Sequence, residues 1–156
     1  MDFAPSPRAA DLAGRVRAFI DERITPVEHD MLADIEARRG RGADPWPPVP
    51  EVDELKAQAR AAGLWNLFLP AGHGDGYAAR YGTDGGTGLT NCDYATVAEQ
   101  TGRSALAPIV FNCNAPDTGN MEVFLNYGSP ELKQRWLEPL LEGRIRSAFL
   151  MTEPGV

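Results

Sequence analysis

The sequence predicts an all-α fold, a helical bundle with one β-strand beginning at its C-terminal end. Apolar residues recur at helical spacing through most of the chain. Favoured cap residues or prolines precede these apolar segments, and glycines follow them. The stretch at 145–151 has the composition of a strand rather than a helix.

The composition indicates a soluble globular protein. The 156 residues are 43% hydrophobic and 24% charged, and a chain of this length can bury its own core. The net charge of −7 argues against nucleic acid or an anionic membrane as a partner. No apolar run approaches the roughly 18 residues of a membrane span. The first residues show no export signal, so a cytoplasmic location is expected.

The first helix is expected to begin at Pro7, because Ser6 is a favoured N-cap and proline is favoured at the first helical position. Its apolar stripe continues to about Ile24. The stripe consists of residues at helical spacing: Leu12, Val16, Phe19 and Ile20.

Pro26 interrupts this pattern and predicts a kink. Thr25 and Glu28 have the spacing of a capping box around the proline, so a second helix is expected to begin there and to end before Gly40. Residues 40–50 form a proline-dense connector that cannot be regular helix.

The middle of the chain alternates between one helix and two irregular segments. A helix is expected from Pro50 or Glu51 to Gly63. The apolar stretch 64–70 should lie against the core. The glycine-rich loop 71–89 is long for a compact domain, which indicates either mobility or function.

The sequence of the last third of the chain predicts four more helical segments and the strand. Their limits follow from cap residues and closing glycines: 91–102, 104–110, 116–127, 129–143, and then the strand at 145–151. The buried stripe of the 129–143 segment is expected to contain the apolar residues at helical spacing: Leu132, Trp136, Leu137, Leu140 and Leu141.

The residues alone show no catalytic constellation. His29 and His73 have no matching nucleophile, and the glycine loop lacks the lysine and hydroxyl residue of a P-loop. Cys92 and Cys113 are not in CxxC spacing, so two buried free thiols are expected and no metal site.

Two consecutive motifs near the C-terminus carry a family resemblance. Residues 127–143 read YGSPELKQRWLEPLLEG, and residues 146–154 read RSAFLMTEP. In order and separation, they resemble the acyl-CoA dehydrogenase family, in which a similar helix leads into a strand with a T-E-P motif. Residues 63–70, followed by the glycine-rich loop, resemble another passage of that family. Residues 111–122 are similar to a subgroup whose animal members fuse the dehydrogenase to a kinase-like domain.

The resemblance implies a division of the chain and a cofactor. Residues 1–143 would form the N-terminal helical domain, and residues 144–156 would begin the flavin-binding middle β-domain. The cofactor would be FAD. Phe149 would line its isoalloxazine ring, Met151 would offer backbone contacts, and Thr152 would offer its N–H and hydroxyl to the polar edge of the ring.

The implied reaction is the α,β-dehydrogenation of a fatty acyl-CoA, as in fatty acid β-oxidation. In the family a glutamate of the C-terminal bundle removes the α-proton, and that bundle lies outside these residues. The chain is therefore expected to be inactive alone. It would form homo-oligomers or associate with the missing domains.

Two other interpretations remain open at this point. The chain could be a helical interaction module that has lost the chemistry. It could also be one half of a split flavoenzyme, completed by a separately encoded polypeptide.

Overall fold

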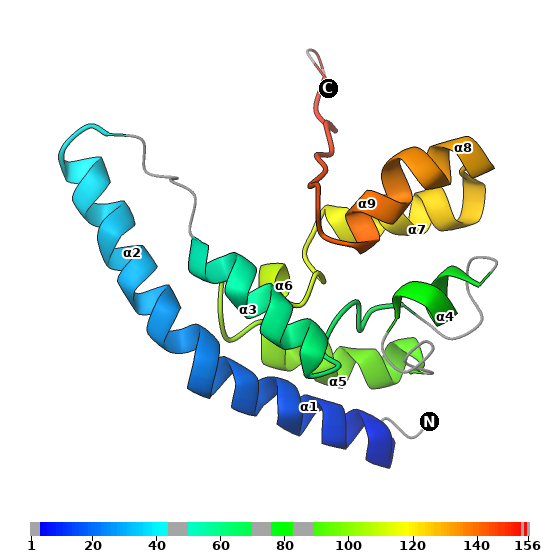
Figure 1. The fold of residues 1–156 in the computed structure, drawn as a ribbon, viewed down its shortest axis with the longest axis horizontal. Helices are drawn as coiled ribbons and strands as arrows, with labels where there is room; N and C mark the ends of the chain where they lie inside the picture. Colours follow the sequence, from blue (N-terminus) through cyan, green and yellow to red (C-terminus); the bar gives the residue numbers. More distant parts are fainter. Residues whose placement is uncertain (1–3, 44–49, 70–75, 83–88, 154, 156) are drawn as a thin grey trace.

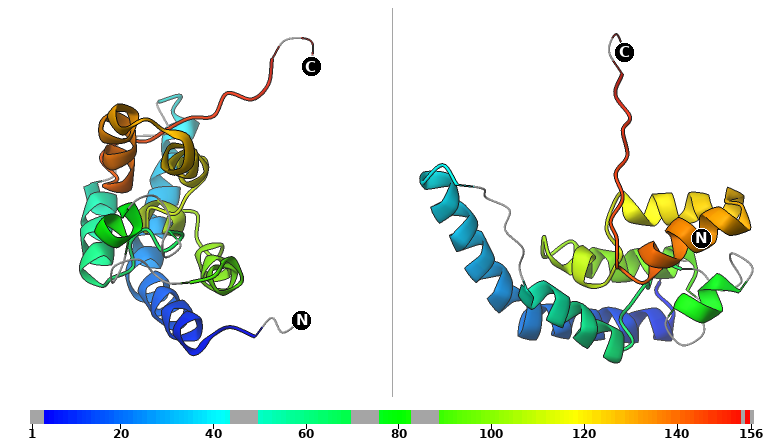
Figure 2. Two further views of the ribbon diagram at one scale, coloured as in Figure 1. Left: turned by 90° about the vertical axis from the view of Figure 1, so that its right-hand side faces the viewer. Right: turned by 45° about the horizontal axis from the view of Figure 1, so that its top comes forward.

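The computed structural model describes residues 4–43, 50–69, 76–82, 89–153 and 155. Within these ranges the chain is helical and no strand is assigned, which confirms the all-α prediction. Figures 1 and 2 show the N-terminal helices along one side of the molecule and the C-terminal helices above them. A tail projects away from the body at the C-terminal end.

The N-terminal third is one long bent helical rod. It consists of α1 (Pro7–Phe19), the π-helical turn η1 (Ile20–Ile24) and α2 (Thr25–Gly40). Ser6 is the N-cap, as predicted, and its hydroxyl accepts a hydrogen bond from the Ala9 N–H at 3.2 Å. Figure 1 shows that α1 and α2 run in different directions, which confirms the bend expected near Pro26.

The capping box expected around Pro26 is wrong. The Thr25 hydroxyl donates back to the Ile20 carbonyl at 3.0 Å. Glu28 instead accepts from the N–H groups of Ala105 and Leu106, at 2.6 and 3.2 Å. The reason is that the helix does not begin at Thr25, so no unpaired N–H groups are there to be capped.

Among the described residues, two prolines that lie inside helical rods each follow a π-helical turn. The Thr25 N–H donates to Ile20 just before Pro26, and the Glu138 N–H donates to Lys133 just before Pro139. Proline has no N–H, and its ring crowds the carbonyl four residues earlier. A wider turn at that point lets the rod continue past the proline.

The second of these turns changes which side chains are buried. Leu132 and Trp136 were expected in the buried stripe of the 129–143 segment, but they are 44% and 41% exposed. The π-helical turn at 133–137 breaks the 3.6-residue period on which that expectation depended.

Further helices build the rest of the body. Their bounds are α3 (Pro50–Ala61), α4 (Tyr77–Tyr81), α5 (Asn91–Thr101), α6 (Ala107–Val110), α7 (Asp117–Tyr127), α8 (Pro130–Leu132), η3 (Lys133–Leu137) and α9 (Glu138–Leu141). The helix α4 lies inside the segment expected to be a loop, and the rings of Tyr77 and Tyr81 stack on it at 5.8 Å. Residues 71–75 and 83–88 of that loop, Pro70 before it, and residues 44–49 of the proline-dense connector lie outside the described residues.

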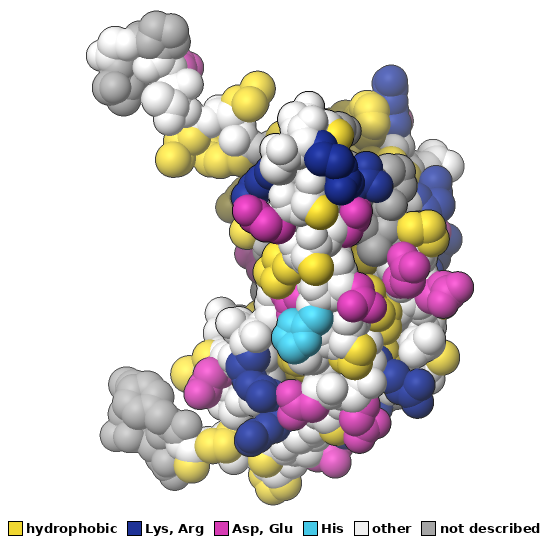
Figure 3. All heavy atoms as spheres, turned by 90° about the vertical axis from the view of Figure 1, so that its left-hand side faces the viewer, with side chains coloured by type: hydrophobic (Ala, Val, Ile, Leu, Met, Phe, Trp, Pro, Cys, Tyr) yellow, Lys and Arg dark blue, Asp and Glu magenta, His cyan; other side chains and the backbone are white. Residues whose placement is uncertain are grey.

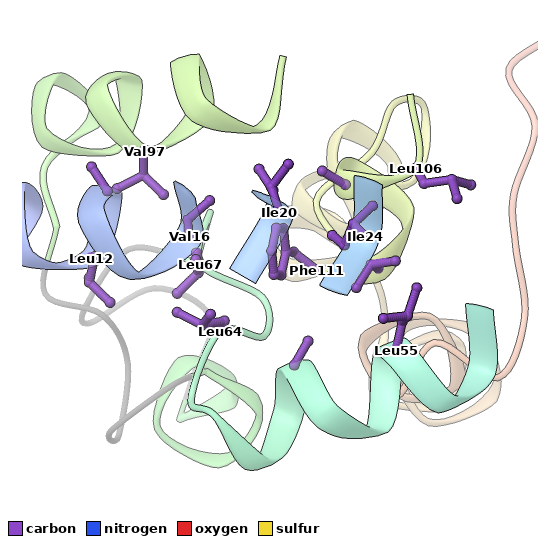
Figure 4. Packing of buried hydrophobic residues seen from close by; sticks show 14 of the residues in the cluster. Leu12, Val16, Ile20, Ile24, Leu55, Leu64, Leu67, Val97, Leu106 and Phe111 are labelled. Carbon is purple, nitrogen blue, oxygen red and sulfur yellow. The ribbon is translucent and has the colours of Figure 1, made fainter. Parts of the chain in front are cut away.

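Two hydrophobic clusters form the core. The larger joins α1, η1, α3, α5 and α6, as Figure 4 shows. Phe111 is fully buried within it and meets Phe19 edge-on at 5.5 Å. The smaller cluster joins the 68–69 segment to α7, η3 and α9. The C-terminal helices thus have their own apolar contacts beside the main core.

The face of the molecule that carries α2 has mixed charges. Figure 3 shows basic and acidic side chains interspersed on this face, with no large patch of one sign. Across the part of the chain that the structure describes, every helix is too short or too polar to cross a bilayer.

Candidate functional site

The residues predicted to contact a cofactor lie on the projecting tail. Residues 146–153 leave the body beside α7 and α9 and extend away from it (Figures 1 and 2). Phe149 is 65% exposed, Met151 is 75% exposed, and Thr152 is also exposed. The strand expected here is not formed among the described residues, because a strand is stabilised by a hydrogen-bonded neighbour and this tail forms no such ladder.

The base of the tail is held by a buried carboxylate. Asp117, the first residue of α7, is 1% exposed. Its Oδ1 accepts hydrogen bonds from the backbone N–H and the hydroxyl of Ser147, at 2.7 and 2.6 Å. Its Oδ2 accepts from Arg146 Nε at 2.5 Å and from Asn114 Nδ2 at 3.2 Å. The sequence reasoning missed this residue, since its partners are far from it along the chain.

The pKa of Asp117 lies below that of an ordinary aspartate. Burial alone would raise the pKa of this carboxyl, but the hydrogen bonds from Ser147 and the ion pair with Arg146 outweigh burial. Asp117 is therefore ionised at neutral pH.

Acidification is expected to weaken the fold through Asp117. Because its pKa is lower in the folded than in the unfolded chain, its stabilisation is complete above the unfolded value of about 4. It is lost as the pH falls through the folded value. Urea unfolding at pH 7 and at about pH 3 should show a larger loss for the wild type than for Asp117→Asn. Equal losses would contradict this assignment.

An apolar groove opens beside the base of the tail. Its volume is about 410 Å³, and its lining includes Arg146, Ser147 and Ala148 of the tail. Val123 and Trp136, which are 57% and 41% exposed, also line it. The groove thus borders the base of the tail, and exposed apolar surface of this kind is typical of an interaction or ligand site.

Two buried asparagines connect α9, a helix beside the groove, to the main core. Asn66 and Asn112 are 0% and 3% exposed, and both have left-handed backbone, with φ of 52° and 54°. Asn112 Nδ2 donates to Asn66 Oδ1 at 2.7 Å and to the Leu140 carbonyl at 2.9 Å. Asn66 Nδ2 donates to the Leu141 carbonyl at 2.9 Å. These bonds hold the end of α9 in place.

The cysteines and histidines show no catalytic arrangement. Burial raises the pKa of the Cys113 thiol and of the nearby Tyr94 phenol, so Cys113 is a poor nucleophile. Cys92 was expected to be buried and is instead exposed in the first turn of α5, whose buried residues are Val97 and Thr101. His29 is exposed, and His73 lies outside the described residues. Within the described ranges, no three potential ligands gather as a metal site would require.

Comparison with known proteins gives consistent matches over nearly the whole chain. Residues 6–144 match the family described as "Acyl-CoA dehydrogenase, N-terminal domain". A rat protein named "Acyl-CoA dehydrogenase family member 11" is 46% identical over 99% of this chain. "Probable acyl-CoA dehydrogenase FadE2" of Mycobacterium tuberculosis is 43% identical over 100% of it. A solved structure titled as a putative acyl-CoA dehydrogenase from Mycobacterium abscessus is 56% identical over 98% of this chain, with a TM-score of 0.85.

The chain spans only a part of each of these proteins. It covers 18% of the rat protein, 34% of the M. tuberculosis protein and 36% of the M. abscessus chain. The family model ends at residue 144, at the base of the tail, whereas the similarity to these three proteins extends over nearly the whole chain.

Proposed function

Because the chain belongs to the acyl-CoA dehydrogenase family, we propose that it is the N-terminal portion of an FAD-dependent enzyme that dehydrogenates fatty acyl-CoA thioesters between the α and β carbons. The observation that carries the proposal is the anchored apolar tail. Phe149, Leu150 and Met151 are 65%, 95% and 75% exposed on a segment whose base is fixed to α7. Such a segment is suited to form one wall of a site completed by other residues.

The residue types on the tail fit a flavin. A flavin ring needs an apolar surface that excludes water and polar groups that bind its nitrogen and oxygen edge. We propose that Phe149 lies along the ring, that the backbone of Met151 contacts it, and that the Thr152 N–H and hydroxyl bind the polar edge. When bound, FAD would accept the hydride that leaves the β carbon.

We further propose that residues 1–156 do not retain FAD by themselves. A bound cofactor buries most of its surface in a preformed cleft. The three tail residues are exposed and supply one wall. The remaining walls and the catalytic base would come from the parts of the enzyme that the family adds after this domain. Those parts would also supply the main contacts between subunits of a homo-oligomer.

Flavin retention tests this proposal. The purified 156-residue chain, mixed with excess FAD and desalted, is expected to emerge colourless. The same chain continued through the middle and C-terminal domains is expected to retain about one FAD per polypeptide. Retention by the short chain would contradict the claim of an incomplete site.

The same experiment separates the alternatives. If only a second, separately encoded polypeptide restores retention, the chain is half of a split flavoenzyme. If no continuation or partner restores it, the chain is a helical interaction module. The cytoplasmic location expected from the sequence stays a prediction, which cell fractionation would test.

A further inference from the structure

Two side chains on one face of α7, those of Asp117 and Asn120, form hydrogen bonds with the first residues of the tail. Asp117 and Asn120 are three positions apart and so lie on the same side of the helix. Asp117 accepts from the N–H and hydroxyl of Ser147 at 2.7 and 2.6 Å. Asn120 Nδ2 donates to the Ser147 hydroxyl oxygen at 2.8 Å. Ser147 is thus bound at its backbone and at its side chain.

The carboxylate of Asp117 has little freedom to release these partners. It is 1% exposed, and a buried carboxylate is tolerated only when it is paired and hydrogen-bonded. Arg146 supplies the opposite charge at 2.5 Å, and Asn114 donates a further hydrogen bond. Charge-assisted hydrogen bonds of this kind are short and directional. The position and direction of the backbone at Ser147 are therefore fixed relative to α7.

The fixed residue lies next to the proposed flavin contacts. Phe149 is two residues beyond Ser147, and Met151 is two residues further. The attachment of Ser147 therefore fixes the point from which the segment with Phe149 and Met151 extends away from α7.

We infer that Asp117 is a positioning residue, which acts through Ser147 to fix the flavin-contacting segment against the helical domain. The inference rests on the proposed function. The contacts of Asp117 are with Ser147, Arg146 and Asn114, so it has no role as an acid or base in the reaction. Its effect would be to hold Phe149 and Met151 at the correct distance from α7 and from the apolar groove beside it.

The test compares Asp117→Asn with the wild type in two settings. In the 156-residue chain, hydrogen exchange at the Ser147 amide should be at least about tenfold faster in the variant. In the flavin-loaded enzyme, kcat should fall by about tenfold or more, while KM for the acyl-CoA changes much less, because a small misplacement of the flavin wall affects the reaction geometry. The absorption bands of the bound flavin should also change in position or shape.

Three further variants keep the result interpretable. Asp53→Asn is the matched control, since Asp53 lies on the exposed side of α3 and its carboxylate contacts Lys56. It should match the wild type in every readout. Ser147→Ala removes the hydroxyl but retains the backbone N–H, so its effects should be smaller than those of Asp117→Asn. Arg146→Gln removes the charge partner of Asp117. This variant replaces Asp117→Asn in the test if Asp117→Asn does not fold.

Each outcome decides the inference. Faster exchange together with a changed flavin spectrum and a lower kcat supports a positioning role. Faster exchange with an unchanged spectrum and kcat shows that the contact only stabilises the fold, and it overturns the inference. Unchanged exchange at Ser147 also overturns it. If the wild-type and variant enzymes both lack flavin, the proposed function fails, and the inference fails with it.

Discussion

Replacement of Phe111 with alanine is expected to lower the free energy of unfolding by about 3–5 kcal/mol, the usual cost of removing a buried aromatic ring. Phe111 is fully buried in the larger cluster and makes an edge-to-face contact with Phe19. It lies among residues of η1, α3 and the 64–67 segment (Figure 4), so the cavity would be shared by several elements. Chemical denaturation followed by circular dichroism measures the change.

Phe149→Ala is the matched control for this prediction. It removes the same side chain from a position that is 65% exposed on the tail. The free energy of unfolding should change by less than about 0.5 kcal/mol. In the complete enzyme, however, this variant should bind FAD more weakly. Similar losses of stability for the two variants would contradict the placement of Phe111 in the core and of Phe149 outside it.

Replacement of Asn112 with alanine is expected to cost about 2–3 kcal/mol of stability. The substitution deprives Asn66 Oδ1 of the hydrogen bond donated by Asn112, and the site is buried away from water. It also removes a donor to the Leu140 carbonyl. Alanine is in addition less tolerant than asparagine of the left-handed φ of 54° at this position.

Asn126→Ala provides the comparison. Asn126 is exposed on α7, and its amide donates only to the Glu122 carbonyl one turn earlier. Alanine is the better helix former at such a position, so stability should stay the same or rise slightly. If thermal unfolding shows Asn112→Ala to be as stable as Asn126→Ala, the two buried asparagines do not connect the helices as described.

Local signals in the sequence predicted most of the helices. Ser6 and Ser129 each precede a proline, and both act as N-caps in the structure. Their hydroxyls accept from the N–H groups of Ala9 and Leu132. These signals depend on residues within one turn of each other, so a reader of the sequence can recognise them.

The contacts that organise the candidate site depend on residues far apart in the chain. Asp117 binds Ser147 30 positions later, and Asn66 binds Asn112 46 positions later. An aspartate before a helical pattern predicts only a local cap, and an isolated asparagine predicts a turn. Their actual partners are set by the packing of α7 and α9 against the core.

The family resemblance supplied what local reasoning could not. The residues alone gave no catalytic group and no cofactor motif, whereas the motifs at 127–143 and 146–154 indicated the family, which the comparisons then showed. The structure adds the exposure of Phe149 and Met151 and the attachment of their segment to α7. The roles of Phe149, Met151 and Thr152 as flavin contacts stay predictions.

Anaerobic addition of a fatty acyl-CoA to the complete, flavin-loaded enzyme tests the central proposal most directly. The bound flavin is expected to lose its yellow colour as it takes up the hydride, and the enoyl-CoA product should form in equal amount. The short chain with free FAD should show neither change. A complete enzyme whose bound flavin stays oxidised with acyl-CoA thioesters of every chain length would contradict the proposed function.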